Sequence, residues 1–134
     1  DETQSVIKAL QAAIQINDVT EGLNQNSTEI SEKLRVGVGI NTGAASMGIG
    51  HDATALGDAV NIAFRLESAT KVLGTDIVMS ESSYSTLPQD CLAGEKQHIR
   101  VKGKRDTLRI CSLYFADVKK MLHSYNEQLN QKQG

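Results

Sequence analysis

The sequence predicts an α+β domain in which helices pack against a small sheet. Apolar residues recur every three or four positions over 4–19 and again over 58–73, which is typical of amphipathic helices. Apolar residues alternate with other residues over 34–40, as in a strand. Two further strand-like runs, 98–101 and 108–115, are joined by a glycine-containing turn and predict a hairpin.

Composition restricts the class of protein to which the chain can belong. The 134 residues carry a formal net charge of −2 without a basic excess, which argues against nucleic acid as a partner. The sequence has no apolar stretch of about 18 residues and no leader-like amino terminus, so we expect a cytoplasmic location and no membrane segment in this chain. Cys91 and Cys111 are too few for a disulfide framework or a zinc site, and we expect both to be small buried residues.

The first half of the chain is predicted to run from a helix into a glycine-rich strand. Helix 4–19 is followed by the polar segment 21–33, which offers few residues to bury and predicts a loop or a frayed helix extension. The strand 34–40 then places Gly37 and Gly39 on one face. We expect these glycines to leave room there for another backbone or a ligand.

The central part of the chain is predicted to hold a second helix and a short buried strand. The helix is expected to begin near Asp58, whose side chain can cap its first turn, and to end before Gly74 in a left-handed conformation. Before it, 42–50 could form a hairpin or a second strand. After it, 76–80 predicts a buried strand, and a helix of one to two turns follows toward Leu87.

The carboxyl-terminal part of the chain carries few apolar residues. We therefore expect one domain over 1–116 and a polar tail over 117–134. Such a tail is predicted to fray or to form a poorly anchored helix.

Polar side chains of the predicted helix 58–73 fall on one stripe. At about 100° per residue, Asn61, Arg65 and Ser68 lie within about 80° of Asp58. Because Asn61 and Arg65 are one turn apart, an amide and a guanidinium can reach one external atom, which suits a phosphoryl group that gains charge during a reaction. A solvated helix face with a surface ion pair of about 0 to 1 kcal/mol explains the same residues. The pattern alone leaves both interpretations open.

Other motifs point less strongly to chemistry. Gly37, Gly39 and Gly43 lack the spacing of a dinucleotide-binding loop and the Gly-Lys-Ser/Thr ending of a P-loop. Lys102 and Lys104 flank a glycine in the predicted turn, where they could fold over a phosphate chain or simply be solvated. His51, His98 and His123 show no paired spacing and no nearby acidic partners, so none of them is expected to be a metal ligand or a base.

One known family shares several of these runs. The resemblance rests on RVGVGINTGAASMGIG, TALGDAVNIAFRLESATK, IVMSE and VKGK, which together resemble the class III adenylate and guanylate cyclase catalytic domain. It covers about residues 4–115 and the family's carboxyl-terminal two thirds, and the GD-x-VN-x-A-x-R-LE signature carries most of its specificity. Bacterial-type adenylate cyclases are most similar. The resemblance implies a ferredoxin-like cyclase fold, an antiparallel sheet with helices packed on it, truncated here at its amino-terminal side.

The resemblance also implies roles for single residues. Asn61 is similar to the asparagine that orients the ribose, and Arg65 is similar to the arginine that stabilises the transition state on the α-phosphate. Lys102 resembles the lysine that contacts the terminal phosphates, and Asp58 of the same signature falls with the substrate-binding residues. Thr54 matches the position that reads the base, where aspartate or threonine is typical of adenylate cyclases and cysteine of guanylate cyclases. ATP is therefore the expected substrate.

For the whole protein, the resemblance implies a homodimer that shares its active sites between subunits, forms 3′,5′-cyclic AMP and pyrophosphate, and acts in signalling. The family's two metal-binding aspartates and its adenine-reading lysine precede the helix at 4–19. Mg²⁺ or Mn²⁺ is thus expected to bind residues outside this chain, and the chain alone is expected to be inactive. We also expect an exposed sheet edge and an apolar face that favour self-association.

Three alternatives are left open by the sequence. The chain could belong to a non-catalytic cyclase-homology module for dimerisation or regulation. It could belong to a guanylate cyclase. It could also bind a nucleotide without turnover.

Overall fold

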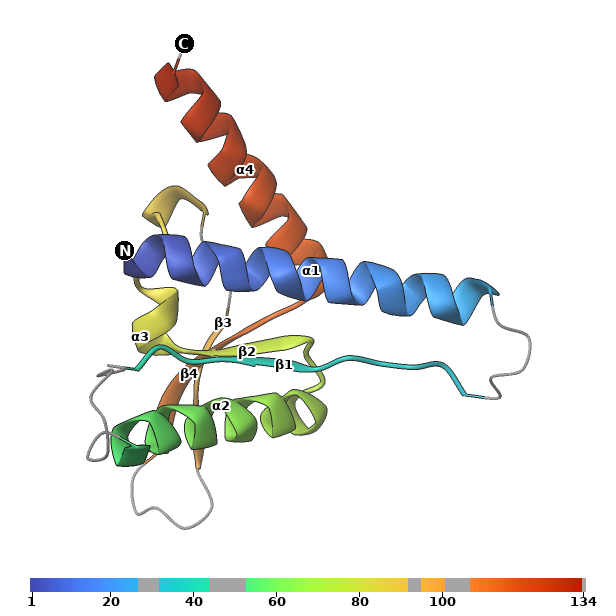
Figure 1. Ribbon diagram of the computed structural model, residues 1–134, viewed down its shortest axis with the longest axis vertical. Coiled ribbons are helices and arrows are strands. Elements are labelled where there is room, and N and C mark those ends of the chain that lie inside the picture. The colour runs from blue at the N-terminus through green and yellow to red at the C-terminus, as the bar shows by residue number, and fades with distance from the viewer. Residues whose placement is uncertain (27–31, 44–52, 92–94, 101–106, 134) are drawn as a thin grey trace.

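The structure is a computed structural model that describes residues 1–26, 32–43, 53–91, 95–100 and 107–133 (Figure 1). In chain order its elements are α1 (Glu2–Asn26), β1 (Val38–Ile40), α2 (Ala53–Leu73), β2 (Ile77–Ser80), α3 (Glu81–Tyr84), the 3-10 helix η1 (Gln89–Cys91), β3 (Glu95–Arg100), β4 (Thr107–Leu113) and α4 (Phe115–Gln133). Helix α1 crosses one face of the sheet and α2 covers the other (Figure 1). The α+β fold class predicted from the sequence is confirmed.

The described strands form one mixed sheet in the order β1-β2-β4-β3. The hairpin predicted near the carboxyl terminus is confirmed, because β3 and β4 pair antiparallel. Strands β2 and β4 are also antiparallel, but β1 and β2 are parallel, with Val38 opposite Ile77. The sheet thus differs from the antiparallel one that was expected. The physical reason is that α2 carries the chain from β1 back across the sheet to β2, and such a crossover joins parallel strands.

Apolar side chains are buried on both faces of the sheet. The larger cluster lies between the sheet, α1 and α4 and includes the fully buried Leu10, Met79 and Val118. The smaller cluster lies under α2 and centres on Leu66. Cys111 is buried, as predicted, whereas the side chain of Cys91 lies outside the described part of the chain. Of the helices described, none is long and apolar enough to cross a bilayer.

The segment after residue 116, predicted to fray or to form a poorly anchored helix, lies over 117–133 in helix α4. Val118, Met121 and Tyr125 recur every three or four residues and are buried. The Tyr125 hydroxyl accepts a 2.8 Å hydrogen bond from Gln4 Nε2 of α1. The helix is anchored more firmly than its polar composition indicated, because a few well-spaced apolar residues are enough to bury one face of an otherwise polar helix. Beyond these contacts α4 extends away from the sheet (Figure 1).

Helix α1 runs further than predicted because tertiary contacts hold its polar end. Thr20 is buried, and Asn24 bonds to the backbone of Leu34 in the segment that leads into β1. Asn24 Nδ2 donates to Leu34 O, and Leu34 N donates to Asn24 Oδ1, each over 2.8 Å. The last part of the helix is thus fixed by the segment that precedes β1. The hairpin or strand predicted over 42–50 lies mostly outside the described residues.

Candidate functional site

Helix α2 lies directly on β1 because glycines remove the side chains between them. A Cβ added at Gly39 would meet the backbone of Ala63 and Glu67, and one added at Gly37 would meet the Thr70 side chain. Real Cβ atoms do not approach backbone so closely, so only glycine fits at position 39 without moving the helix. The expectation that these glycines serve close backbone approach is confirmed.

A second stripe of α2 faces the core. Leu66 packs with Val78 of β2 and Ile110 of β4, and all three are 0% exposed. The helix ends at Leu73, and Gly74 follows with φ +68°, the left-handed stop predicted from the sequence. Two buried stripes therefore fix α2 on the sheet and turn its remaining surface outward.

The outer face of α2 combines polar and apolar side chains. We define it by seven of the exposed residues of α2, which are Asp58, Val60, Asn61, Phe64, Arg65, Ser68 and Val72; the exposed Lys71 lies beside Val72 near the end of the helix. Phe64 is 67% exposed and Val72 is 87% exposed. Because large apolar side chains at this level of exposure mark interaction surfaces when they cluster, the outer face has the character of a contact surface that also carries a guanidinium and an amide.

The structure places the predicted site residues as follows. Asn61 and Arg65 lie one turn apart and are both exposed on the outer face of α2. Asp58 lies on the same helix, but it is not the cap that was predicted, because α2 already begins at Ala53. A capping residue type shows where a helix can begin, and here the helix continues past it toward the amino terminus. Thr54 is in the first turn, its side chain outside the described atoms, and Lys102 lies outside the described residues altogether.

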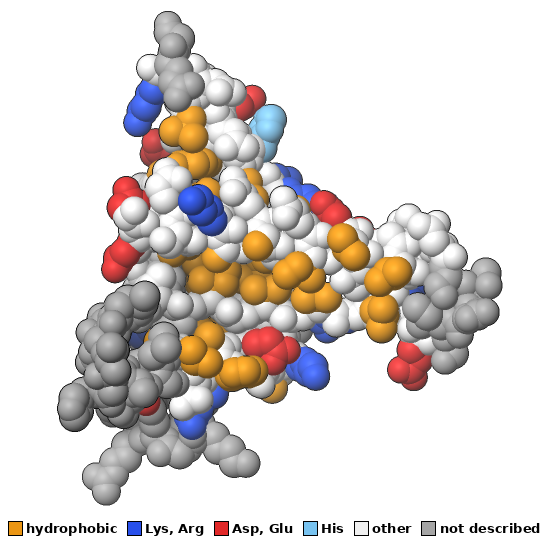
Figure 2. Space-filling model, viewed as in Figure 1, with side chains coloured by type: hydrophobic (Ala, Val, Ile, Leu, Met, Phe, Trp, Pro, Cys, Tyr) orange, Lys and Arg blue, Asp and Glu red, His pale blue; other side chains and the backbone are white. Residues whose placement is uncertain are grey.

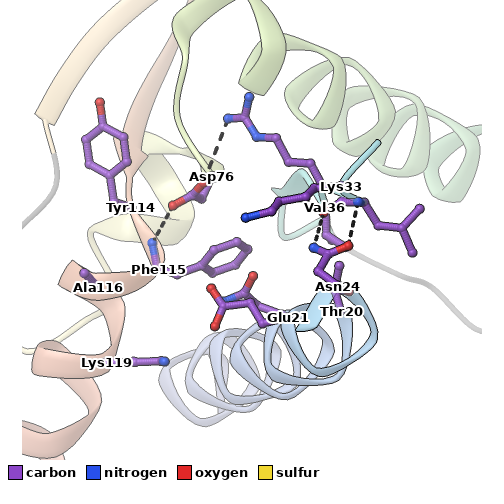
Figure 3. A pocket seen from close by; sticks show the side chains of 13 residues that line it. Thr20, Glu21, Asn24, Lys33, Val36, Asp76, Tyr114, Phe115, Ala116 and Lys119 are labelled. Atoms are coloured by element: carbon purple, nitrogen blue, oxygen red, sulfur yellow. Dashed lines mark hydrogen bonds and ion pairs between the residues drawn. The ribbon is translucent and has the colours of Figure 1, made fainter. Parts of the chain in front are cut away.

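A separate cavity of about 630 Å³ lies between the end of α1, the segment before β1 and the start of α4 (Figure 3). Arg35 Nη2 donates to Thr75 O over 2.9 Å and lies 3.9 Å from Asp76 Oδ1. Asp76 Oδ2 accepts a 2.8 Å hydrogen bond from Phe115 N, at the start of α4. These contacts link the segment before β1 to the residues before β2 and to the start of α4. No residue of α2 lines the cavity.

A second apolar surface follows α1. Ile16, Val19 and Leu23 are about half exposed or more on one side of the helix, and Leu34 is 48% exposed in the segment before β1. Figure 2 shows hydrophobic side chains gathered along α1 on its side toward β1. Among the described strands, β1 is an edge of the sheet. This surface agrees with the apolar face and the edge expected from the sequence.

Metal ligands were expected outside this chain. In the part of the chain that the structure describes, no three His, Cys, Asp or Glu side chains lie together in a way that could hold a metal ion. The assignment of Mg²⁺ or Mn²⁺ to the intact domain stays a prediction.

Sequence reasoning missed one residue that contacts α2. Asn41, directly after β1, donates from Nδ2 to Ala59 O of α2 over 3.2 Å. Its only signal in the sequence is a polar amide at the end of a strand, which does not identify the helical carbonyl that it meets.

Comparison with known proteins points in one direction. The family model described as "Adenylate and Guanylate cyclase catalytic domain" matches residues 1–115. An adenylate cyclase of Anabaena cylindrica is 34% identical to the chain over 115 residues, which cover 76% of this chain and 23% of that protein. The chain thus spans less than a quarter of the length of this relative. No solved structure gives a significant match.

Proposed function

This chain belongs to the adenylate and guanylate cyclase catalytic domain family, and from that premise we propose that it forms part of an adenylate cyclase acting in intracellular signalling. The observation that carries the proposal is the pair Asn61 and Arg65, exposed one turn apart on the outer face of α2. The choice of ATP over GTP is supported by Thr54 at the base-reading position and by a relative named as an adenylate cyclase.

The proposed reaction is an intramolecular phosphoryl transfer. The ribose 3′-oxygen attacks the α-phosphorus of ATP, and a new P–O bond forms while the bond to the β-phosphate oxygen breaks. The hydroxyl proton is lost and pyrophosphate leaves, so 3′,5′-cyclic AMP remains. Charge collects on the oxygens around the α-phosphorus, and fixed donors aimed at them lower the barrier.

Each predicted site residue has a role in this reaction. Arg65 supplies rigid N–H donors and a permanent charge to the α-phosphate oxygens. Asn61 holds the ribose so that its 3′-oxygen is in line with the leaving group. Thr54 contacts the base, Lys102 the terminal phosphates, and Asp58 lies with the substrate-binding residues. The described residues do not form a site for Mg²⁺ or Mn²⁺, so we assign no step to a metal held by this chain.

We further propose that a second subunit covers the outer face of α2. Asn61 and Arg65 are exposed and point away from their own core, so the nucleotide that they reach must lie outside this chain's interior. The exposed Val60 and Phe64 beside them give this surface the apolar area that a subunit contact requires. The homodimer would then place Asn61 and Arg65 of one subunit in a site completed by the other.

Replacing Phe64 with serine tests the homodimer. Loss of a buried phenyl ring from the contact should weaken dimerisation by about 10- to 100-fold. Sedimentation equilibrium at micromolar concentration measures this change. Leu129→Ser, which alters an exposed apolar residue of α4, is the matched control and should leave the dimer intact. An unchanged dissociation constant in Phe64→Ser would exclude this face as the contact.

The activity itself is tested with a polypeptide that joins these residues to the upstream region in which the resemblance places the metal ligands. Purified protein is incubated with ATP or GTP and a divalent metal, and the products are separated by chromatography. We expect cyclic AMP from ATP at a kcat/KM at least about 10-fold above that for GTP. Preferential formation of cyclic GMP would indicate a guanylate cyclase. Nucleotide binding without product would indicate a protein without turnover, and neither would indicate a dimerisation module.

A further inference from the structure

We propose that Asn41 is a positioning residue that sets the rotation of α2 on the sheet and thereby the direction of Asn61 and Arg65. The inference deepens the proposed function and rests on it where turnover is concerned. It starts from a physical property of the contact between α2 and β1.

That contact lacks interlocking side chains. Gly37 and Gly39 present bare backbone to α2, and the helix meets them through Ala63, Glu67 and Thr70. Close contact of this kind is stabilised by dispersion, but few side chains of one element insert between side chains of the other. On this side of α2 few side chains oppose a rotation, so a directional bond here adds to the buried cluster around Leu66 in fixing the helix.

Asn41 provides a directional bond. Its Nδ2 donates to Ala59 O over 3.2 Å, two residues before Asn61 along the helix. Only the amide nitrogen can pair with a carbonyl, so the orientation of the Asn41 side chain follows from chemistry. The bond joins the residue after β1 to the first half of α2, two residues before Asn61 and six before Arg65.

Asn41 is itself held in place from the other side. The next residue, Thr42, donates from its backbone N to Ser83 Oγ over 2.9 Å, and the two hydroxyl oxygens are 3.0 Å apart. Ser83 is 0% exposed, and its hydroxyl lies 2.8 Å from that of Ser80, the cap of α3. The chain after β1 is therefore fixed to a buried hydroxyl cluster, and Asn41 extends from a rigid base.

A small rotation of α2 about its axis would displace Asn61 and Arg65 enough to lower the rate of the reaction. Asn61 and Arg65 lie about half a turn around α2 from Ala59 and Ala63, which face β1. A rotation of about 10° moves a side chain at a radius of about 6 Å by about 1 Å. Misplacement of this size costs about 10²-fold in rate when the group must meet a transition state.

A double-mutant cycle in the active polypeptide tests this link. Asn41→Ala should lower kcat by about 10- to 100-fold with little change in KM. Asn41→Asp, which keeps the size of the side chain but cannot donate to a carbonyl, should show the same loss. In an Arg65→Ala background the same changes should lower kcat by a clearly smaller factor, because only Asn61 is then left to be misplaced. Equal losses in both backgrounds would overturn the proposal.

Asn24→Ala is the matched control. Asn24 also donates to a backbone carbonyl across elements, at Leu34, and its hydrogen bonds are to Leu34 and not to α2. Its replacement should lower stability and leave kcat unchanged in both backgrounds. A loss of kcat in Asn24→Ala as large as that in Asn41→Ala would show that general loosening, and not the direction of α2, sets the rate.

A readout without turnover separates this inference from the proposed function. Backbone amide resonances of α2 over 58–67 in the 134-residue chain should shift in Asn41→Asp and not in Asn24→Ala. Unmoved α2 resonances in Asn41→Asp would overturn the positioning role. A different outcome is that the α2 resonances shift in Asn41→Asp while Arg65→Ala keeps normal activity. This outcome would overturn the cyclase mechanism and keep Asn41 as the residue that orients α2.

Discussion

Replacing Arg65 with alanine should lower kcat for cyclic AMP formation by about 10²- to 10³-fold, with a smaller change in KM. The guanidinium is assigned to charge that develops on the α-phosphate in the transition state, and loss of one such donor costs about 3 to 4 kcal/mol in comparable sites. The side chain is exposed on α2, so its removal should leave the fold intact. Steady-state assays with ATP, supported by a circular dichroism melt, measure both effects.

Lys71→Ala is the control for this experiment. Lys71 is an exposed cation in the last turn of the same helix, away from Asn61 and Arg65. Its replacement removes the same formal charge and should change kcat by less than about twofold. A drop of less than about tenfold in Arg65→Ala, equal to about 1.4 kcal/mol, would contradict a transition-state role.

Replacing Gly39 with alanine should destabilise the domain by about 3 kcal/mol. The added Cβ would collide with backbone atoms of Ala63 and Glu67, which cannot move aside as a flexible side chain can. Helix α2 would have to lift from β1, so kcat should fall together with stability. Urea denaturation followed by circular dichroism gives the free energy of unfolding.

Gly22→Ala, a change at a second glycine, should have the opposite effect on the stability of the chain. Gly22 lies inside α1, and a Cβ there would meet no atom within 4 Å. Alanine should therefore stabilise the chain by about 0.5 to 1 kcal/mol, since it favours the helix over the unfolded state. If Gly39→Ala were as well tolerated as Gly22→Ala, close packing of α2 on β1 would not be required.

Local patterns in the sequence were enough to identify most elements but not their limits. The hairpin near the carboxyl terminus and the left-handed stop at Gly74 follow from residue types that act over a few positions. The end of α1 depends on Asn24 meeting the backbone of Leu34, and the existence of α4 depends on Tyr125 and its neighbours finding a place against α1. Contacts between distant segments decide these cases, and periodicity does not report them.

For the candidate site, too, local patterns were sufficient for some features, and contacts between distant segments decided the others. The 3.6-residue period correctly predicted that Asn61 and Arg65 lie on one side of α2, and both are exposed there. Their catalytic roles came from resemblance and stay proposals. The period could not show that Gly39 touches the backbone of α2 or that Asn41 bonds to Ala59, because both facts depend on how a helix is laid on a strand.

Asp76 gives α4 a mechanical connection to the centre of the sheet. Its backbone N donates to Leu113 O of β4 over 3.1 Å, and its backbone O accepts from Val38 N of β1 over 3.0 Å. Its carboxylate holds Phe115 N at the base of α4 over 2.8 Å. Through Asp76 the first residue of α4 is therefore connected to β1, the strand on which α2 lies, so a displacement at the start of α4 would reach the strand that supports Asn61 and Arg65.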